Sequence, residues 1–74
     1  MNYQTLVDGT TTVGTTYICK ADLWRAEADS FWQIIAIDID WNKKYPRNLK
    51  WQPSDEFVFK ASQRASYTYS YIPA

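Results

Sequence analysis

The segment that most constrains the fold is the run from Phe31 to Trp41. Apolar residues occupy alternate positions on one side of this run, interrupted by Gln33. The other side is apolar as far as Ala36 and then carries Asp38 and Asp40. Alternation with a period of two is typical of a β-strand, and apolar residues on both sides are typical of a strand covered on both faces. We therefore expect a central strand that is covered over its first half and leaves the core at about Asp38.

The residue composition extends this β character to the whole chain. Seven Thr, six Tyr, six Ile and four Trp stand against three Leu, and β-branched and aromatic side chains fit a pleated, half-buried surface. The turn residues Asp8–Gly9 close the first predicted strand. The further strands predicted from alternation and turn residues are Asn2–Val7, Thr15–Ala21, Leu49–Trp51 and Ser66–Ile72. We expect an all-β fold, a single domain over residues 1–74 built as a small barrel or sandwich of about five strands.

Three connecting segments are less regular. Residues 42–48 are basic and contain Pro46, which predicts a loop. Residues 22–30 begin with Asp22, a good N-cap residue, and contain helix formers, so we expect either one short helix or a turn there. Residues 54–64 also open like a capped helix, but the phenylalanines at 57 and 59 alternate as in a strand, and we favour a short strand or turn.

The composition excludes most catalytic schemes. The chain has 74 residues, eight basic and eight acidic side chains, one Cys and no His. The lack of His removes the usual general base, proton shuttle and metal ligand, and a single Cys forms neither an internal disulfide nor a cysteine-based zinc site. We expect no enzymatic activity, no cofactor and no bound metal. The zero net charge argues against a nucleic-acid partner.

Two groups of reactive side chains have a structural interpretation beside a functional one. Asp38 and Asp40 are spaced to share one strand face, where paired carboxylates could serve glycoside hydrolysis or calcium binding. We favour a solvated strand end beside Lys43 and Lys44. Cys19 lies in a predicted strand with no histidine to activate it, and we interpret it as a buried small apolar residue.

A basic cluster interleaved with aromatic residues follows the longest predicted strand. It consists of Lys43, Lys44, Arg47 and Lys50 with Trp41, Tyr45 and Trp51. Such a pattern holds single-stranded nucleic acid by charge and stacking, so a small nucleic-acid-binding barrel is one alternative function. The acidic residues on both sides of the cluster cancel its field and argue against this alternative.

A stripe of tyrosines marks the last predicted strand, where Tyr67, Tyr69 and Tyr71 share one face. Such a stripe is an ordinary core face with hydroxyls at its rim, a protein interface, or a set of flat platforms for sugars. Because the chain holds six Tyr, four Trp and three Phe, some aromatic surface must be exposed, and the terminal strand leaves an edge that can pair with another chain. The residues expected at an interface are Tyr67, Tyr69, Tyr71, Trp41, Tyr45, Trp51 and Trp24.

Three short motifs, taken in order, resemble a family of short proteins encoded in tailed-bacteriophage genomes. They are Thr16–Ala21 (T-Y-I-x-K-A), Trp32–Ile37 (W-x-I-x-x-I) and Arg64–Ser70 (R-A-S-x-x-Y-S). The resemblance covers most of the chain, from about Thr15 to Ser70. The sequence departs from the family pattern at Cys19, where Gly is usual, in residues 22–30 and in residues 57–60. The motifs are strand motifs, and the resemblance implies a virion component.

We therefore expect a non-enzymatic structural protein of a tailed-phage virion. A domain of this size buries only about 60% of its unfolded surface, and such domains often depend on partners. We expect it to dock by aromatic surface and strand edges into a symmetric assembly, as capsid decoration or cement or as a head–tail or tail attachment. Its partners would be other virion proteins or copies of itself.

The expected location is the virion, after synthesis in the host cytoplasm. The N-terminus has no signal-peptide pattern, and no apolar run is long enough to span a membrane, so we expect no membrane partner. The main alternative function is a host-attachment or carbohydrate-binding β-module that uses its Trp and Tyr side chains as platforms.

Overall fold

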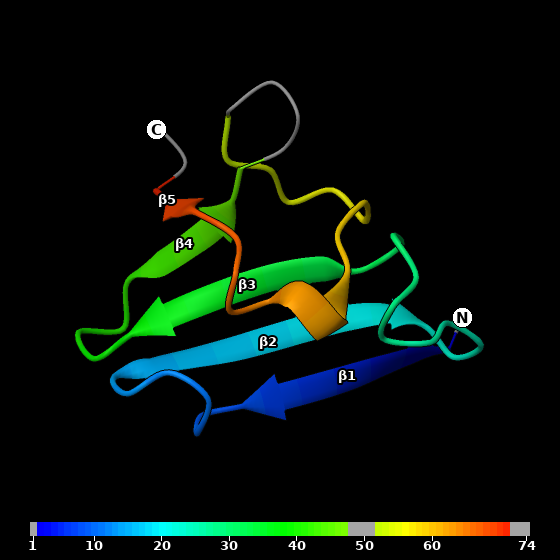
Figure 1. Cartoon of the computed structure of the whole chain (residues 1–74), viewed down its shortest axis with the longest axis horizontal. Helices are drawn as coiled ribbons and strands as arrows, with labels where there is room; N and C mark the ends of the chain where they lie inside the picture. The colour runs from blue at the N-terminus through cyan, green and yellow to red at the C-terminus, as the bar shows by residue number, and fades with distance from the viewer. Residues whose placement is uncertain (1, 48–51, 72–74) are drawn as a thin grey trace.

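Five antiparallel strands follow one another across a single sheet (Figure 1). The computed structural model describes residues 2–47 and 52–71. The strands are β1 (Tyr3–Asp8), β2 (Thr15–Asp22), β3 (Gln33–Asp38), β4 (Lys43–Pro46) and β5 (Tyr69–Ser70). The described residues contain one helical element, the 3-10 helix η1 (Ala61–Gln63). The prediction of an all-β fold is confirmed, and the turn expected at Asp8–Gly9 follows β1.

The register of the three longest strands defines the two faces of the sheet. Leu6 pairs with Cys19, and Cys19 pairs with Ile34. This row lies on the face that we call the inner face. Successive residues of a strand point to opposite sides, so the adjacent row lies on the other face, which we call the outer face. That adjacent row is Val7, Ile18 and Ile35.

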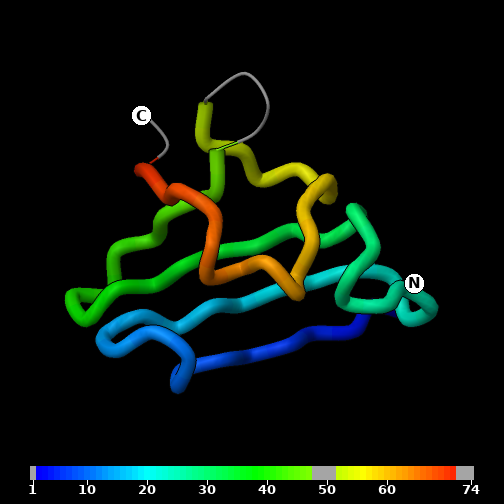
Figure 2. Tube along the Cα trace, viewed as in Figure 1, coloured from blue at the N-terminus to red at the C-terminus, as the bar shows by residue number. Residues whose placement is uncertain are grey.

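The hydrophobic core lies on the inner face, under a segment that folds back over the sheet. After β4 the chain crosses β3 and approaches β2 before it returns to the sheet edge as β5 (Figure 2). Phe59 in this segment exchanges two backbone hydrogen bonds with Trp32, at 2.9 and 3.0 Å. The buried residues of the core are Tyr17, Cys19, Ala21, Trp32, Ile34, Ala36, Phe59 and Ala61. Residues 54–64 contain an isolated bridge at Phe59 and the 3-10 helix η1. The bridge agrees with the short strand or turn that the sequence favoured, whereas η1 was not predicted.

The connection between β2 and β3 is a series of turns tied to the core by Trp32. Backbone hydrogen bonds from Arg25 to Asp22 and from Asp29 to Ala26 close two of these turns. The Trp32 indole Nε1 donates to the Ala26 carbonyl oxygen at 2.8 Å, which satisfies a donor that would otherwise be costly to bury. Of the two conformations expected for residues 22–30, the turn is the one that forms.

β3 is shorter than predicted and is covered on one face only. It ends at Asp38 because the carboxylate of this residue accepts the backbone N–H groups of Asp40 and Asn42, at 2.9 and 3.0 Å, and closes a turn. Its inner residues are buried, whereas Phe31 is 49% exposed and Ile35 is only half-buried. The expectation of a strand covered on both faces over its first half is therefore wrong. The segment has two apolar sides, but the described chain covers only the inner one.

Residues 43–46 form β4, where the sequence predicted a loop. Lys44 pairs with Ala36 of β3, and Pro46 pairs with Tyr69 of β5. Pro46 is fully buried at the end of the strand, a position where the missing N–H of proline does not interrupt a ladder. The sequence did not predict this strand because its two consecutive lysines interrupt the alternation of apolar and polar residues that marks a strand.

The last strand is shorter than the predicted Ser66–Ile72, since β5 contains only Tyr69 and Ser70. Ser66 is held in a turn, because both its backbone N–H and its hydroxyl donate to the Gln63 carbonyl oxygen, at 2.9 and 2.8 Å. The predicted strand Leu49–Trp51 lies outside the described residues.

Candidate docking interface

The outer face of the sheet carries a group of apolar side chains that the described chain leaves uncovered. Ile18, Ile35 and Ile37 are half-buried along the two central strands. Towards the β3–β4 turn and the sheet edge the exposure rises, to 66% for Val7, 80% for Ile39 and 83% for Trp41. The strand register joins the members on the strands, and a shared groove joins Ile39 and Trp41 to them. We call this group the outer apolar surface. Its members are Val7, Ile18, Ile35, Ile37, Ile39 and Trp41.

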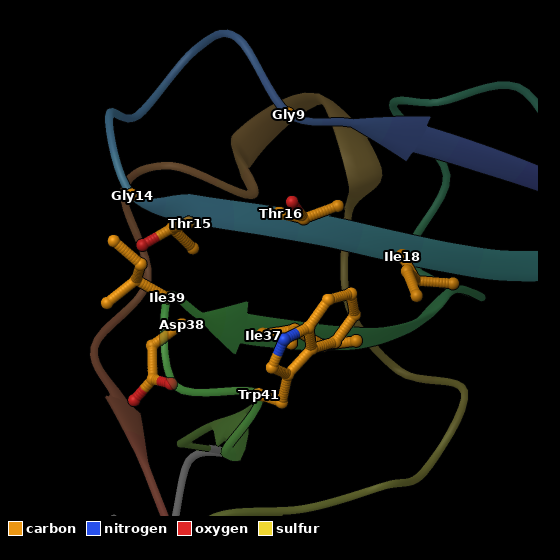
Figure 3. A pocket seen from close by; sticks show the side chains of 9 residues that line it. All are labelled: Gly9, Gly14, Thr15, Thr16, Ile18, Ile37, Asp38, Ile39 and Trp41. Atoms are coloured by element: carbon orange, nitrogen blue, oxygen red, sulfur yellow. The ribbon is translucent and has the colours of Figure 1, made fainter.

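The outer apolar surface contains an open groove of about 420 Å³ (Figure 3). The Trp41 indole lies beside Ile37 over β3, and Ile18 of β2 flanks it (Figure 3). Two threonines, Thr15 and Thr16, stand at the end of the groove near the turn (Figure 3). The full lining is Gly9, Gly14, Thr15, Thr16, Ile18, Ile37, Asp38, Ile39 and Trp41. The groove therefore presents an apolar floor with a polar end.

The turn between β3 and β4 holds Trp41 in an unusual backbone conformation. Trp41 N donates to the Asp38 carbonyl oxygen at 3.0 Å, and the φ angle of Trp41 is 66°. A positive φ at this position of a hairpin turn is ordinarily taken by Gly or Asn, because a Cβ makes the left-handed region unfavourable. The left-handed conformation is unfavourable for tryptophan, and the Trp41 side chain, which is mostly exposed, gains little burial in return. Such local strain is characteristic of positions kept for a functional contact.

The opposite end of the outer face is aromatic and charged. The Lys20 ammonium lies 4.9 Å from the centre of the Tyr3 ring, and the Arg25 guanidinium lies 3.8 Å from that of Phe31. Phe57 stacks against Tyr3 with 6.2 Å between ring centres. These contacts place cations directly on the aromatic surface. The outer face is therefore asymmetric, apolar near the β3–β4 turn and mixed near the β2–β3 turns.

Two of the three tyrosines in the predicted stripe are packed against the core. The Tyr69 ring lies 5.6 Å from that of Tyr17, and its hydroxyl donates to the Arg64 carbonyl oxygen. Burial raises the pKa of Tyr69 well above its usual value. Tyr67 meets Phe59 edge to face at 5.3 Å, and its hydroxyl accepts the Lys60 backbone N–H. Of the three alternatives for the stripe, the structure favours the core face for these two rings, which are partly buried and pack against the core.

The other residues expected at an interface are dispersed. Tyr71 is 53% exposed at the sheet edge, where its ring lies 5.2 Å from the Lys44 ammonium and its hydroxyl donates to Asp38. Tyr45 is half-buried on β4. Trp24 is 93% exposed in the turns that follow β2, far along the chain from the groove. Trp51 lies outside the described residues. Among the members of this set that the structure describes, only Trp41 lines the groove of the outer apolar surface.

The acidic pair and the cysteine occupy structural positions. β3 ends at Asp38, so Asp38 and Asp40 do not share a strand face as the sequence predicted, because Asp40 lies in the turn. The hydrogen bond from the backbone N–H of Asn42 is the main cause that holds the pKa of Asp38 below its usual value. Lys44 lies 4.0 Å from the same carboxylate. Cys19 is fully buried, as predicted, and burial raises the pKa of its thiol to about 11.

The basic cluster is partly neutralised by its own neighbours. Arg47 donates from Nε to the Ser70 hydroxyl at 2.9 Å. Lys44 contacts Asp38 and the Tyr71 ring, as described above, while Lys43 is exposed on β4. Lys50 lies outside the described residues. The described part of the cluster is therefore divided between the two faces of β4.

A partly buried ion pair that the sequence did not reveal joins the end of β1 to Arg64, the residue after η1. Arg64 Nε donates to Asp8 Oδ2 at 2.9 Å, across 56 positions of the chain. Arg64 also donates from Nη1 to the Ala61 carbonyl at 2.8 Å and to Glu27 at 3.3 Å. Asp8 further accepts hydrogen bonds from Thr10 and Thr11. No local sequence pattern relates Asp8 to Arg64, so only the fold reveals this pair.

This pair makes stability sensitive to acid. The Thr11 hydroxyl, the Thr10 backbone N–H and the Arg64 guanidinium, in that order, hold the pKa of Asp8 well below its usual value. A carboxyl whose pKa is lower in the folded state contributes stability that is fully present above its unfolded pKa, about 4, and is lost as the pH falls towards the folded value. We expect Asp8→Asn to flatten the fall in urea midpoint between about pH 5 and pH 2. The exposed Asp55→Asn control should keep the acid dependence of the unsubstituted protein, and an unchanged slope in Asp8→Asn would contradict this assignment.

In residues 2–47 and 52–71, no helix is long and apolar enough to cross a membrane. No group of three or more Cys, Asp or Glu side chains in the same residues could hold a metal ion. Comparison with known proteins finds no matching family model, no matching curated protein and no matching solved structure.

Proposed function

We propose that this protein is a non-enzymatic structural protein that docks through its outer apolar surface into a symmetric assembly, the virion of a tailed phage. The observation that supports docking is the uncovered apolar side of a sheet whose other side holds the core. The resemblance of the strand motifs to short tailed-phage proteins supports the choice of assembly. The partner that covers the outer apolar surface is then another protein of the virion.

The outer apolar surface has the properties of a protein interface. A sheet in a stable domain normally buries its apolar face against another layer, and contiguous exposed apolar patches mark interaction sites in soluble proteins. Trp41 is a large anchor in the left-handed conformation, projecting from a turn beside a groove lined by Ile37 and Ile18. Tryptophan is enriched among the residues that dominate binding energy at interfaces. Docking would bury this anchor together with the isoleucines around it.

The chemistry of the chain supports a structural role over a catalytic one. The sequence contains no His, its cysteine is buried with a raised pKa, and Asp38 is committed to closing a turn. A general acid or base needs a group within reach of a substrate and a pKa near the working pH. These side chains instead stabilise the domain that carries the outer apolar surface.

Quantitative mass spectrometry of purified virions tests this proposal. The protein should be present at a fixed ratio to the major capsid protein. A copy number comparable to that protein indicates decoration or cement, and a number that matches a small ring indicates a neck or tail position. Absence from the particle would overturn the virion assignment.

A substitution at Trp41 should separate docking from folding. The left-handed conformation costs a residue with a Cβ roughly 1–2 kcal/mol, whereas glycine adopts it freely. Trp41→Gly is therefore expected to keep or slightly raise the free energy of unfolding while incorporation into virions falls. Trp24→Ala, which also removes an exposed indole, should incorporate normally. Normal incorporation of Trp41→Gly would show that docking uses another surface.

The groove also favours a second candidate function, carbohydrate binding. An exposed indole beside hydroxyls resembles the platforms on which sugars stack, and Trp41, Thr15 and Thr16 supply these groups. A glycan array distinguishes the two candidates, because a purely structural protein should bind no glycan there. Binding that is lost in Trp41→Gly would favour the carbohydrate module.

A further inference from the structure

A small pocket lies on the outer face, at the end of the sheet opposite the Trp41 turn. It has a volume of about 160 Å³, and the described residues that line it are Tyr3, Asp22, Phe31 and Phe57. Tyr3 and Asp22 lie opposite each other on β1 and β2, the two lower strands in Figure 1. Pockets for small molecules are typically about 300–1,000 Å³. This smaller pocket therefore suits a single side chain.

Three aromatic rings form the walls of the pocket. Phe31 and Phe57 are 49% and 39% exposed, so a ligand can reach them from solvent. Tyr3 is already engaged, because its ring stacks against that of Phe57 and lies 4.9 Å from the Lys20 ammonium. Tyr3 is therefore a wall that Phe57 supports, and the binding groups are on the other lining residues.

The fourth lining residue supplies a negative charge. Asp22 is exposed, and the hydrogen bonds that it accepts from Gln4 and Arg25 end on its backbone carbonyl oxygen, at 2.8 and 3.1 Å. Within residues 2–47 and 52–71, no ion pair includes its carboxylate. A cation is attracted to the face of an aromatic ring and to a carboxylate. The pocket combines both kinds of group.

Two cations of the chain itself show that these rings attract positive charge. The Arg25 guanidinium lies 3.8 Å from the centre of the Phe31 ring, and the Lys20 ammonium lies near Tyr3, as described above. Neither of these two residues lines the pocket. The space beside Asp22 is therefore not filled by either cation.

We propose that this pocket takes a lysine side chain of the protein on which the outer face docks. The inference rests on the proposed function for the identity of that partner. Lysine fits better than arginine, because its compact ammonium can reach the carboxylate while its flexible four-carbon stem packs along the rings. Trp41 binds at the apolar end of the outer face and the pocket binds a cation at the other end. Such complementarity fixes the orientation of a docked partner.

An NMR titration with Nα-acetyl-lysine methylamide tests the pocket on the isolated protein. The ring protons of Phe31 and Phe57 should shift in a saturable way. The same compound acetylated at Nε keeps the stem but has no charge, and it should cause no saturable shift. Asp22→Asn should weaken binding roughly two- to fivefold, the range for an exposed ion pair. Asp40→Asn, which removes an equal charge in the β3–β4 turn, should bind like wild type.

The contribution of the rings is tested separately at Phe57. Phe57→Leu keeps an apolar side chain but removes the ring face, and it should weaken binding roughly two- to fivefold. Val58→Ala changes an exposed neighbour that does not line the pocket, and it should bind like wild type. Circular dichroism should show that both variants are folded.

Zero-length cross-linking of purified virions identifies the partner. A carbodiimide couples a carboxylate to an amine that contacts it, and an amide forms with loss of water. Asp22 should be linked to a lysine of another virion protein. This link should be lost in Asp22→Asn and kept in Asp40→Asn.

Four results would overturn this inference. They are a titration without a saturable shift, an equal shift with the Nε-acetylated compound, equal affinity of Asp22→Asn and wild type, and virions that contain the protein but show no link from Asp22 to a lysine. A protein that enters virions without binding the lysine amide would reject the pocket and leave the proposed function standing. A protein that binds the amide but is absent from virions would do the reverse.

Discussion

Replacing Trp32 with alanine is expected to lower the free energy of unfolding by about 3–5 kcal/mol. Trp32 is 1% exposed and is among the largest fully buried side chains of the described core. A domain of this length has a total stability of roughly 4–11 kcal/mol, so the variant should lose a large part of it. Two losses combine here: a cavity opens between the sheet and the covering segment, and the Ala26 carbonyl loses the indole donor that lies 2.8 Å away.

Urea unfolding followed by far-UV circular dichroism measures this loss. Trp24→Ala is the matched control, since it removes the same side chain from a site that is 93% exposed. Surface substitutions of this kind usually change stability by less than about 0.5 kcal/mol. A comparable loss in both variants would show that the indole of Trp32 does not anchor the core.

The sequence predicted the fold best where one face of a strand is buried. In Thr15–Asp22 the alternation puts Tyr17, Cys19 and Ala21 on one side, and these three residues are buried in the core. The Asp8–Gly9 turn was predictable in the same way, because it depends on residues adjacent in sequence. Local signals of this type need no knowledge of the rest of the chain.

What the sequence could not predict is which of two apolar faces becomes covered. In the Phe31–Trp41 segment, the side with more apolar residues is the outer one, which stays open. The side of Trp32, Ile34 and Ala36 became the core because the segment around Phe59 pairs with Trp32. Which side is covered depends on this contact between two residues 27 positions apart in the sequence. The alternation of apolar and polar residues carries no information about such a contact.

The candidate site was predicted only in part for the same reason. Trp41 was identified as an exposed aromatic, and it lines the groove. The isoleucines beside it were assigned to a covered strand, and the tyrosine stripe was left open between core and surface. Tyr69 packs against the core because Pro46 and Tyr17 meet it from different strands. Composition indicated that aromatic surface must be exposed, but only the topology shows where.

Phe59→Ala is expected to destabilise the domain by about 3–5 kcal/mol, as much as the change at Trp32. Phe59 is 3% exposed and is the main apolar anchor of the segment that covers the inner face. Its ring meets Tyr67 edge to face at 5.3 Å, and its backbone is joined to Trp32 by two hydrogen bonds. Removal of the ring leaves these backbone bonds without the packing that excludes water from them.

Hydrogen exchange shows whether the covering segment is released. In Phe59→Ala the amides of Trp32 and Phe59, which donate to each other's carbonyls, should lose their protection together, since both bonds depend on the same contact. Phe57→Ala provides a control with the same side chain two residues away, at a site 39% exposed, and should cost about 1 kcal/mol. Equal losses at the two positions would mean that the segment is held from the outer face through Phe57 and Tyr3. A much larger loss at Phe59 would show that the segment is held mainly from the inner face, through the packing of the Phe59 ring.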